Sequence, residues 1–288
     1  MTAIHGRELV AVGVDGTPES VHAAQWAVQA ANLRHVDVLL VNAYEVSMKS
    51  PELPPEAVGA VRRATERVVN EVASQLVVPP MMKVGTLVEL ASPVTLLLRI
   101  SATAALMVLG GHHFNLVDRL LTGPVTSAVA ARADCPVVVV PGTRASTTAT
   151  TRSVVVALDG ETAGTATLDF AFAEAELRRC GLVALHAIAV REGLSDQGSR
   201  TSLAEVLAGH EQSHPDIPVQ TLFIAGEPED AIVDQSWAAA LIVVGRPHRR
   251  RLGSWNRSVA KAVLDHTHCP LVVVPQMSVK SSRTGRFS

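Results

Sequence analysis

Short apolar runs alternate with longer amphipathic segments along most of the chain. Runs such as PVVVVP and LIVVG are apolar at every position, which is typical of strands covered on both faces of a sheet. Segments such as PESVHAAQWAVQAANLR and PPEAVGAVRRATERVVNEVASQL carry apolar residues three and four positions apart, as helices with one buried face do. Over the first half, this pattern predicts strands at residues 9–14, 36–41, 82–84, 105–109 and 136–140.

The sequence also repeats itself. VAVGVDGTPES around Asp15 returns as VVVALDGETAG around Asp159, and ALMVLGGHH, ending at His113, returns as ALIVVGRPH, ending at His248. A third pair, CPVVVVP and CPLVVVP, follows in the same order. Three matches in one order indicate an internal duplication.

Strands that alternate with helices favour a mostly parallel sheet with right-handed crossovers. Each copy is therefore predicted to be an α/β domain with a doubly wound, five-stranded, Rossmann-like sheet. We expect a first domain over residues 1–143 and a second over residues 152–276, joined by the small, polar segment GTRASTTATT. The basic, Ser-rich tail, residues 277–288, is expected to be disordered.

Composition narrows the location and the partners. The net charge is −2 and aromatic residues make up 3% of the chain, so neither electrostatic attraction nor base stacking favours a nucleic-acid partner. The three cysteines are odd in number and widely spaced, which does not indicate a disulfide framework. No signal peptide and no apolar run of bilayer length is evident. The expectation is a cytoplasmic protein without a membrane or nucleic-acid partner.

Candidate ligand-binding residues follow two of the predicted strands. Asp15 and Gly16 end the first strand and Gly110 ends the fourth, at the sheet edge where open parallel sheets bind ligands. An aspartate there can accept hydrogen bonds from a base or ribose, and glycine-loop amides can receive phosphates. The alternative is local: an Asp-Gly pair makes a turn, and Asp15 can cap the helix that begins near Pro18.

On these motifs the chain resembles a tandem universal stress protein, over nearly its whole length apart from the linker and tail. In the ATP-binding branch of that family, a V-x-V-D-G-S-like opening supplies an aspartate to adenine, and a loop G-x-x-G-(x)9-G-[ST] holds ribose and phosphates. The resemblance implies ATP, or else ADP, AMP or cAMP, with no metal beyond nucleotide-associated Mg²⁺. It also implies pairing of domains through their last strands, here the CPVVVVP and CPLVVVP runs, and a homodimer.

The first copy departs from the family's loop at two positions. His113 stands at the second glycine position, where a Cβ resists a left-handed backbone. Pro124 stands at the Ser/Thr position and lacks both an N–H and a hydroxyl, although proline suits the first turn of a helix. The positions that match, with one nearby hydroxyl, are Asp15, Gly16, Gly110, Gly123 and Thr126.

The second copy departs differently. Arg257 replaces the final glycine, and His248 stands at the second glycine position. The arginines around this loop either clamp phosphates in place of amides or form a solvated basic surface; the sequence leaves both readings open. The positions that match are Asp159, Gly160, Gly245 and Ser258, and the arginines are Arg246, Arg249, Arg250, Arg251 and Arg257.

The sequence is compatible with two functions. The first is a non-catalytic regulator of stress or dormancy that binds adenine nucleotides and acts by population shift. The second is a structural interaction module whose nucleotide pockets have decayed. G-x-S-x-G and Walker motifs are absent from the sequence, which removes the usual reason to expect a hydrolase or a motor ATPase, and the histidine pairs lack metal-ligand spacing.

Overall fold

The computed structural model describes residues 9–45, 55–111, 124–142, 152–158, 165–188, 197–246, 263 and 266–276. The first half contains β1 (Leu9–Gly13), α1 (Pro18–Arg34), β2 (Asp37–Tyr44), α2 (Pro55–Ser74), β3 (Val84–Leu90), α3 (Pro93–Ser101), β4 (Leu106–Gly111), α4 (Pro124–Arg132) and β5 (Val137–Pro141). The second half contains β6 (Val154–Leu158), α5 (Thr165–Arg178), β7 (Leu182–Ile188), α6 (Gln197–Ser213), β8 (Val219–Ala225), α7 (Pro228–Ser236), β9 (Leu241–Gly245) and β10 (Leu271–Val274). The predicted linker and tail fall largely or wholly outside the described residues.

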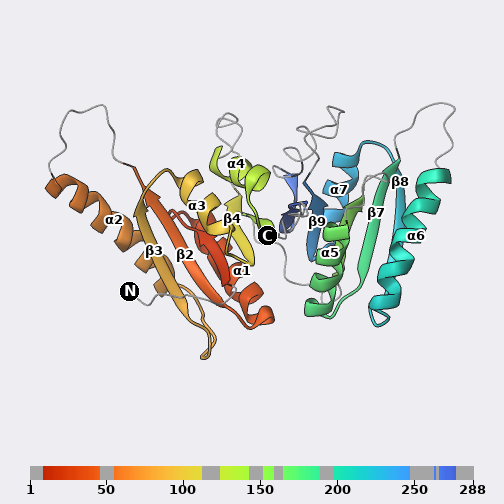
Figure 1. The fold of residues 1–288 in the computed structure, drawn as a ribbon, viewed down its shortest axis with the longest axis horizontal. Coiled ribbons are helices and arrows are strands. Elements are labelled where there is room, and N and C mark those ends of the chain that lie inside the picture. Colours follow the sequence, from red (N-terminus) through yellow and green to blue (C-terminus); the bar gives the residue numbers. More distant parts are fainter. Residues whose placement is uncertain are drawn as a thin grey trace, which may run out of the picture.

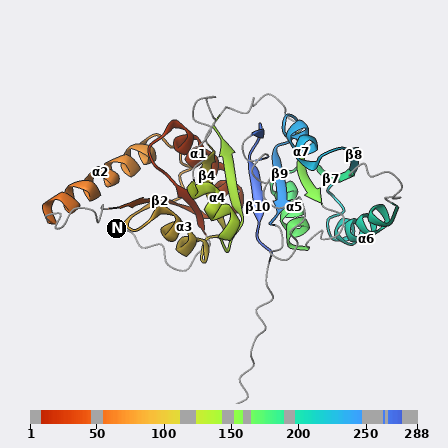
Figure 2. The same cartoon turned by 90° about the horizontal axis from the view of Figure 1, so that it is seen from above.

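The strands of both halves form one sheet in the order β3-β2-β1-β4-β5-β10-β9-β6-β7-β8 (Figure 1). Neighbouring strands are parallel, except that β5 and β10 are antiparallel, with Val138 opposite Val272. Figure 2 shows β10, in blue, at the centre of the molecule, beside the first half. The predicted pairing through the last strands is confirmed, and it turns two five-stranded sheets into a single ten-stranded one.

Helices cover both faces of this sheet. One core lies beneath α1, α2, α5 and α6, and its largest buried side chains include Leu40 and Phe172. The other lies beneath α3, α4 and α7 and includes Met107 and Ile242. Because successive strand residues point to opposite faces, a strand covered on both sides must be apolar at every position. This is the physical reason for the unbroken apolar runs, and the predicted doubly wound α/β class is confirmed.

The third strand lies elsewhere than predicted. The prediction of residues 82–84 is wrong, since β3 begins at Val84 and continues to Leu90 as VGTLVEL. Among the described strands, β3 lies at the edge of the sheet and pairs with β2, and its Thr86 and Leu90 are exposed. An edge strand does not require an unbroken apolar run, and the search for such runs therefore misses it.

Side chains also join the halves away from the β5–β10 seam. Arg34 of α1 forms an ion pair with Glu174 of α5, and the Arg178 guanidinium lies 5.5 Å from the centre of the Trp26 ring. After β9, the Arg246 Nη1 donates to the carbonyl oxygen of Ala133 at 2.6 Å. Within the described residues, no helix has the length and apolar character needed to span a membrane.

Candidate functional site

A pocket lies at the carboxyl ends of β1, β2 and β4, with a cavity volume of about 210 Å³. β1 stands between β2 and β4, so the chain leaves β1 on one side and returns on the other. A crevice at such a switch in strand order is where open α/β sheets bind ligands. The pocket therefore lies at the edge that the sequence predicts.

The first turn after β1 organises one wall. The Asp15 Oδ1 accepts hydrogen bonds from the Thr17 N–H at 3.0 Å and the Thr17 hydroxyl at 2.6 Å. The Thr17 Oγ1 in turn accepts from the Ser20 N–H at 3.2 Å, and this makes Thr17 the N-cap of α1. The sequence suggests Asp15 as a possible N-cap of α1, but the structure gives that role to Thr17. Asp15 instead fixes the rotamer of the Thr17 side chain, and it remains exposed at the rim of the pocket.

The two glycines at these strand ends permit close backbone approaches. Gly16 has φ +86, and a Cβ there would meet the Val68 Cγ1 at 2.8 Å. At Gly110, a Cβ would lie 3.1 Å from the carbonyl carbon and oxygen of Glu19, in the first turn of α1. Gly110 thus lets β4 pack against the N-terminus of α1, beneath the pocket.

Much of the pocket surface is apolar and was not identified from the sequence. Side chains from β2, α3, β4 and α4 supply it, together with Val14 after β1. At the N-terminal end of α3, the Ser92 Oγ accepts from the Thr95 N–H at 3.3 Å. Spacing within the sequence could not assign these residues to a pocket, because they come from segments far apart in the chain. The apolar lining residues include Val14, Val41, Leu96, Leu97, Leu109 and Val125.

The charge on the described lining is negative. Among the described residues that line the pocket, the charged side chains are Asp15 and Glu19. Thr126 lines the pocket from the first turns of α4, whose described part begins at Pro124. Two carboxylates with hydroxyl groups and an apolar floor suit a neutral ring that carries hydrogen-bond donors better than they suit a phosphate.

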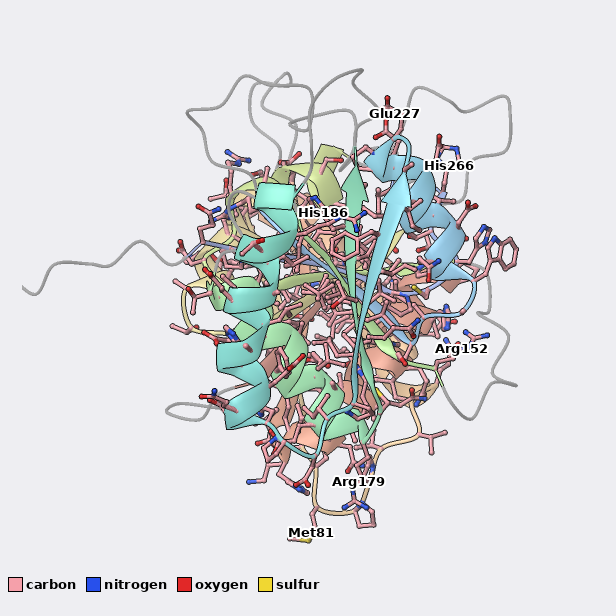
Figure 3. The ribbon with its side chains drawn as sticks, turned by 90° about the vertical axis from the view of Figure 1, so that its right-hand side faces the viewer. Met81, Arg152, Arg179, His186, Glu227 and His266 are labelled. Carbon is pink, nitrogen blue, oxygen red and sulfur yellow. The ribbon has the colours of Figure 1, made fainter. Side chains whose placement is uncertain are left out.

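The same edge of the second half carries different side chains. By the strand registers, His186 holds in β7 the place that Asn42 holds in β2, where Asn42 lines the first pocket. The buried His186 Nδ1 lies 3.0 Å from the Leu158 carbonyl oxygen, and its ring meets Phe223 edge-on at 5.9 Å. Figure 3 shows His186 at the end of the molecule opposite Arg179.

Gly245 repeats the packing role of Gly110 in the second half. A Cβ at Gly245 would meet the Thr167 Oγ1 at 2.9 Å, in the first turns of α5. The remaining predicted site residues lie outside the described residues, and their placement stays a prediction: His113, Gly123, Asp159, Gly160, His248, Arg257 and Ser258. Over the described part of the chain, no group of three or more His, Cys, Asp or Glu side chains could hold a metal ion.

Comparison with known proteins relates the chain to one family. The model of the universal stress protein family matches residues 7–141 and 150–275. The chain belongs to this family. Universal stress protein Rv2005c of Mycobacterium tuberculosis is 31% identical over 285 residues, which cover 93% of this chain and 97% of that protein.

Solved structures agree on the fold. A universal stress protein from Archaeoglobus fulgidus covers 93% of this chain and 98% of its own, with a TM-score of 0.71 and 15% identity. A universal stress protein solved in complex with cAMP covers 47% of this chain at 22% identity, with a TM-score of 0.32. The bound cAMP is a finding about that protein alone. The structure from Archaeoglobus fulgidus establishes the universal stress protein fold for this chain.

Proposed function

We propose that this universal stress protein is a non-catalytic regulator that binds an adenine nucleotide in the pocket of its first half. The observation that carries the proposal is the cavity at the β1/β4 switch point, which has an apolar floor and Asp15 on its rim. An adenine ring offers flat apolar faces and an exocyclic amine, which complement such a floor and a carboxylate acceptor. The favoured ligand is ATP, with ADP, AMP and cAMP as alternatives.

The charges that line the pocket indicate that the adenosine part of the ligand would lie inside it and the phosphates outside. With Asp15 and Glu19 as its charged side chains, the described lining favours adenosine over a phosphate chain. The phosphates would then extend past Thr126, toward the first turn of α4. The N–H groups at the start of α4 would face them with the positive end of a helix dipole. Binding would act by population shift, favouring the conformation whose pocket fits the nucleotide.

A structural interaction module is the second candidate, and two contacts favour it. Asp15 is engaged by Thr17, and Arg246, one of the predicted phosphate clamps, donates to Ala133 in the other half. Both side chains therefore have structural roles that need no nucleotide. A cytoplasmic location is part of either proposal.

Calorimetric titration of the full chain with adenosine, ATP, ADP, AMP and cAMP tests the proposal. We expect binding by at least one nucleotide below millimolar concentration, and about tenfold weaker binding by Asp15→Asn, which removes the charge from one hydrogen bond. Asp216→Asn, which changes an exposed aspartate after α6, is the matched control and should bind as the wild type does.

Filling the cavity provides an independent check. Leu97→Trp would extend an indole into the apolar floor and should abolish adenosine binding while the chain stays folded. If no adenine compound binds the wild type below millimolar concentration, the interaction module is the better account. Steady phosphate release from ATP that Asp15→Ala abolishes would overturn the non-catalytic part of the proposal.

A further inference from the structure

A second hollow lies between the carboxyl ends of α1 and α5, at the amino ends of the strands. It is therefore at the opposite edge of the sheet from the proposed adenine pocket of the first half. Its volume is about 1100 Å³, and both halves of the chain line it. Figure 3 shows Arg179 at this end of the molecule. We call it the interhalf groove; its polar lining residues are Asn32, His35, Arg152, Glu176, Arg178 and Arg179.

Positive charge exceeds negative charge around the interhalf groove. Among the described residues that line it, three are arginines and one, Glu176, carries a carboxylate. Behind Arg178, the buried Glu174 is shared with Arg34, so a single carboxylate faces two guanidinium groups. Burial, and after it the charge of Arg178, lower the pKa of the neighbouring Arg34 to about 10.

The Arg178 guanidinium has buried hydrogen-bond donors that no described acceptor receives. Its Nη2 lies 3.1 Å from the Glu174 Oε2, but the geometry is not that of a hydrogen bond. Both the Nε and the Nη2 of Arg178 are buried beside the face of Trp26, and neither has a hydrogen-bond partner among the described residues. Buried charged donors without acceptors cost free energy, and an anion in the groove would reduce that cost by neutralising the guanidinium at close range.

Helix capping accounts for only part of this arrangement. Basic residues stabilise the last turn of a helix because carbonyl groups there lack partners. Here the His35 N–H donates to the Ala31 and Asn32 carbonyls, and the Cys180 N–H donates to the Ala175 carbonyl at 3.0 Å. Arg152 precedes β6 and belongs to no helix, so the arginines exceed what the two helix ends require.

We propose that the interhalf groove binds a multivalent phosphate-type anion, held by Arg152, Arg178 and Arg179. Guanidinium groups suit this ligand because their planar fork donates two hydrogen bonds to one phosphate. The ligand would contact α1 and α5 together, and the site exists only where the two halves meet. It is separate from the adenine pocket and does not depend on it.

Titration of the full chain with inorganic tripolyphosphate at 0.15 M salt tests the proposal. We expect saturable binding that Arg179→Gln weakens about tenfold and Arg179→Glu abolishes, since each loses an exposed guanidinium in the groove. Arg63→Gln, which removes an exposed arginine of α2, should bind as the wild type does. Equal losses in Arg179→Gln and Arg63→Gln, or no binding to the wild type at millimolar tripolyphosphate, would overturn the proposal.

Crossed titrations separate this site from the adenine pocket. Arg179→Glu should bind adenosine like the wild type, while Leu97→Trp should bind tripolyphosphate like the wild type. Tripolyphosphate binding that is lost in Leu97→Trp and kept in Arg179→Glu would assign the anion to the pocket and refute the groove. Because Arg179 is exposed, Arg179→Gln should keep the wild-type unfolding midpoint, so that its weaker binding reflects the groove and not the fold. Arg179→Glu places a negative charge at the carboxyl end of α5 and should lower the midpoint slightly.

Discussion

Arg34 and Glu174 form a buried ion pair that joins the first helix of one half to the first helix of the other. Glu174 is 2% exposed and also lies 3.1 Å from Arg178. The Glu174 carboxylate neutralises two guanidinium groups that are themselves largely buried, so the packing of α1 against α5 depends on it.

Glu174→Gln should therefore be strongly destabilising. The change leaves two largely buried guanidinium groups without their carboxylate, and breaking a buried ion pair of this kind costs about 3–5 kcal/mol. Urea unfolding followed by circular dichroism would measure the loss. Glu66→Gln is the matched control, because Glu66 pairs with Arg62 on the exposed face of α2 and should contribute less than about 1 kcal/mol. Equal effects of the two changes would contradict the buried role of Glu174.

Substitutions of Gly110 and Gly245 by alanine should differ in whether a second substitution can restore part of the lost stability. Gly110→Ala places a Cβ 3.1 Å from the Glu19 backbone, so we expect a loss of about 1–3 kcal/mol and weaker adenosine binding. Gly245→Ala meets only the side chain of Thr167, and Thr167→Ala should relieve part of its cost. A double-mutant cycle should show coupling of at least about 0.5 kcal/mol for the second pair.

Gly59→Ala is the control for these glycine changes. Its Cβ would meet only the end of the flexible Arg63 side chain, within α2, so the change should stabilise the protein by about 0.5–1 kcal/mol. If Gly110→Ala proved equally stabilising, the close approach of β4 to α1 would be wrong.

Alkaline pH should destabilise the protein through two buried thiols. Burial raises the pKa of Cys135 and of Cys269 from 9.0 to about 12. Below pH 9, both states keep these protons; between pH 9 and 12, the unfolded chain loses them and the folded chain does not. Stability should thus fall as pH rises, by about 1.4 kcal/mol per pH unit for each thiol.

The double variant Cys135→Ala and Cys269→Ala isolates that effect. Whatever its stability at pH 7, its free energy of unfolding should fall less steeply than that of the wild type between pH 9 and 10.5. Urea titrations at several pH values measure the two slopes, and parallel slopes would refute the assignment. Lysine and tyrosine titration is common to both proteins and cancels in the comparison.

The sequence predicts the fold well wherever strands are covered on both faces. β5 and β10 contain unbroken valine-rich runs because each lies in the middle of the sheet, and α1 begins and ends at the bounds of its amphipathic segment. β3 escapes detection because it lies at the edge. The pairing of β5 with β10 was implied by the family resemblance rather than by any spacing.

The candidate site is only partly predictable. Asp15 and Gly110 stand out because they follow apolar runs and recur in the second copy. Thr17 was overlooked because the capping rule fits Asp15 equally well until backbone geometry decides between them. Leu97 and Asn42 carry no motif, and only the folded chain brings them to the same pocket.

Because β5 and β10 belong to one polypeptide, their antiparallel pairing should not weaken when the protein is diluted. Strand pairing between separate molecules weakens on dilution, whereas two strands of one polypeptide meet at an effective concentration in the millimolar range or above. The central seam should accordingly persist at the lowest protein levels in a cell. Any self-association that does respond to protein abundance would have to use another surface, and among the described strands the outermost ones are β3 and β8.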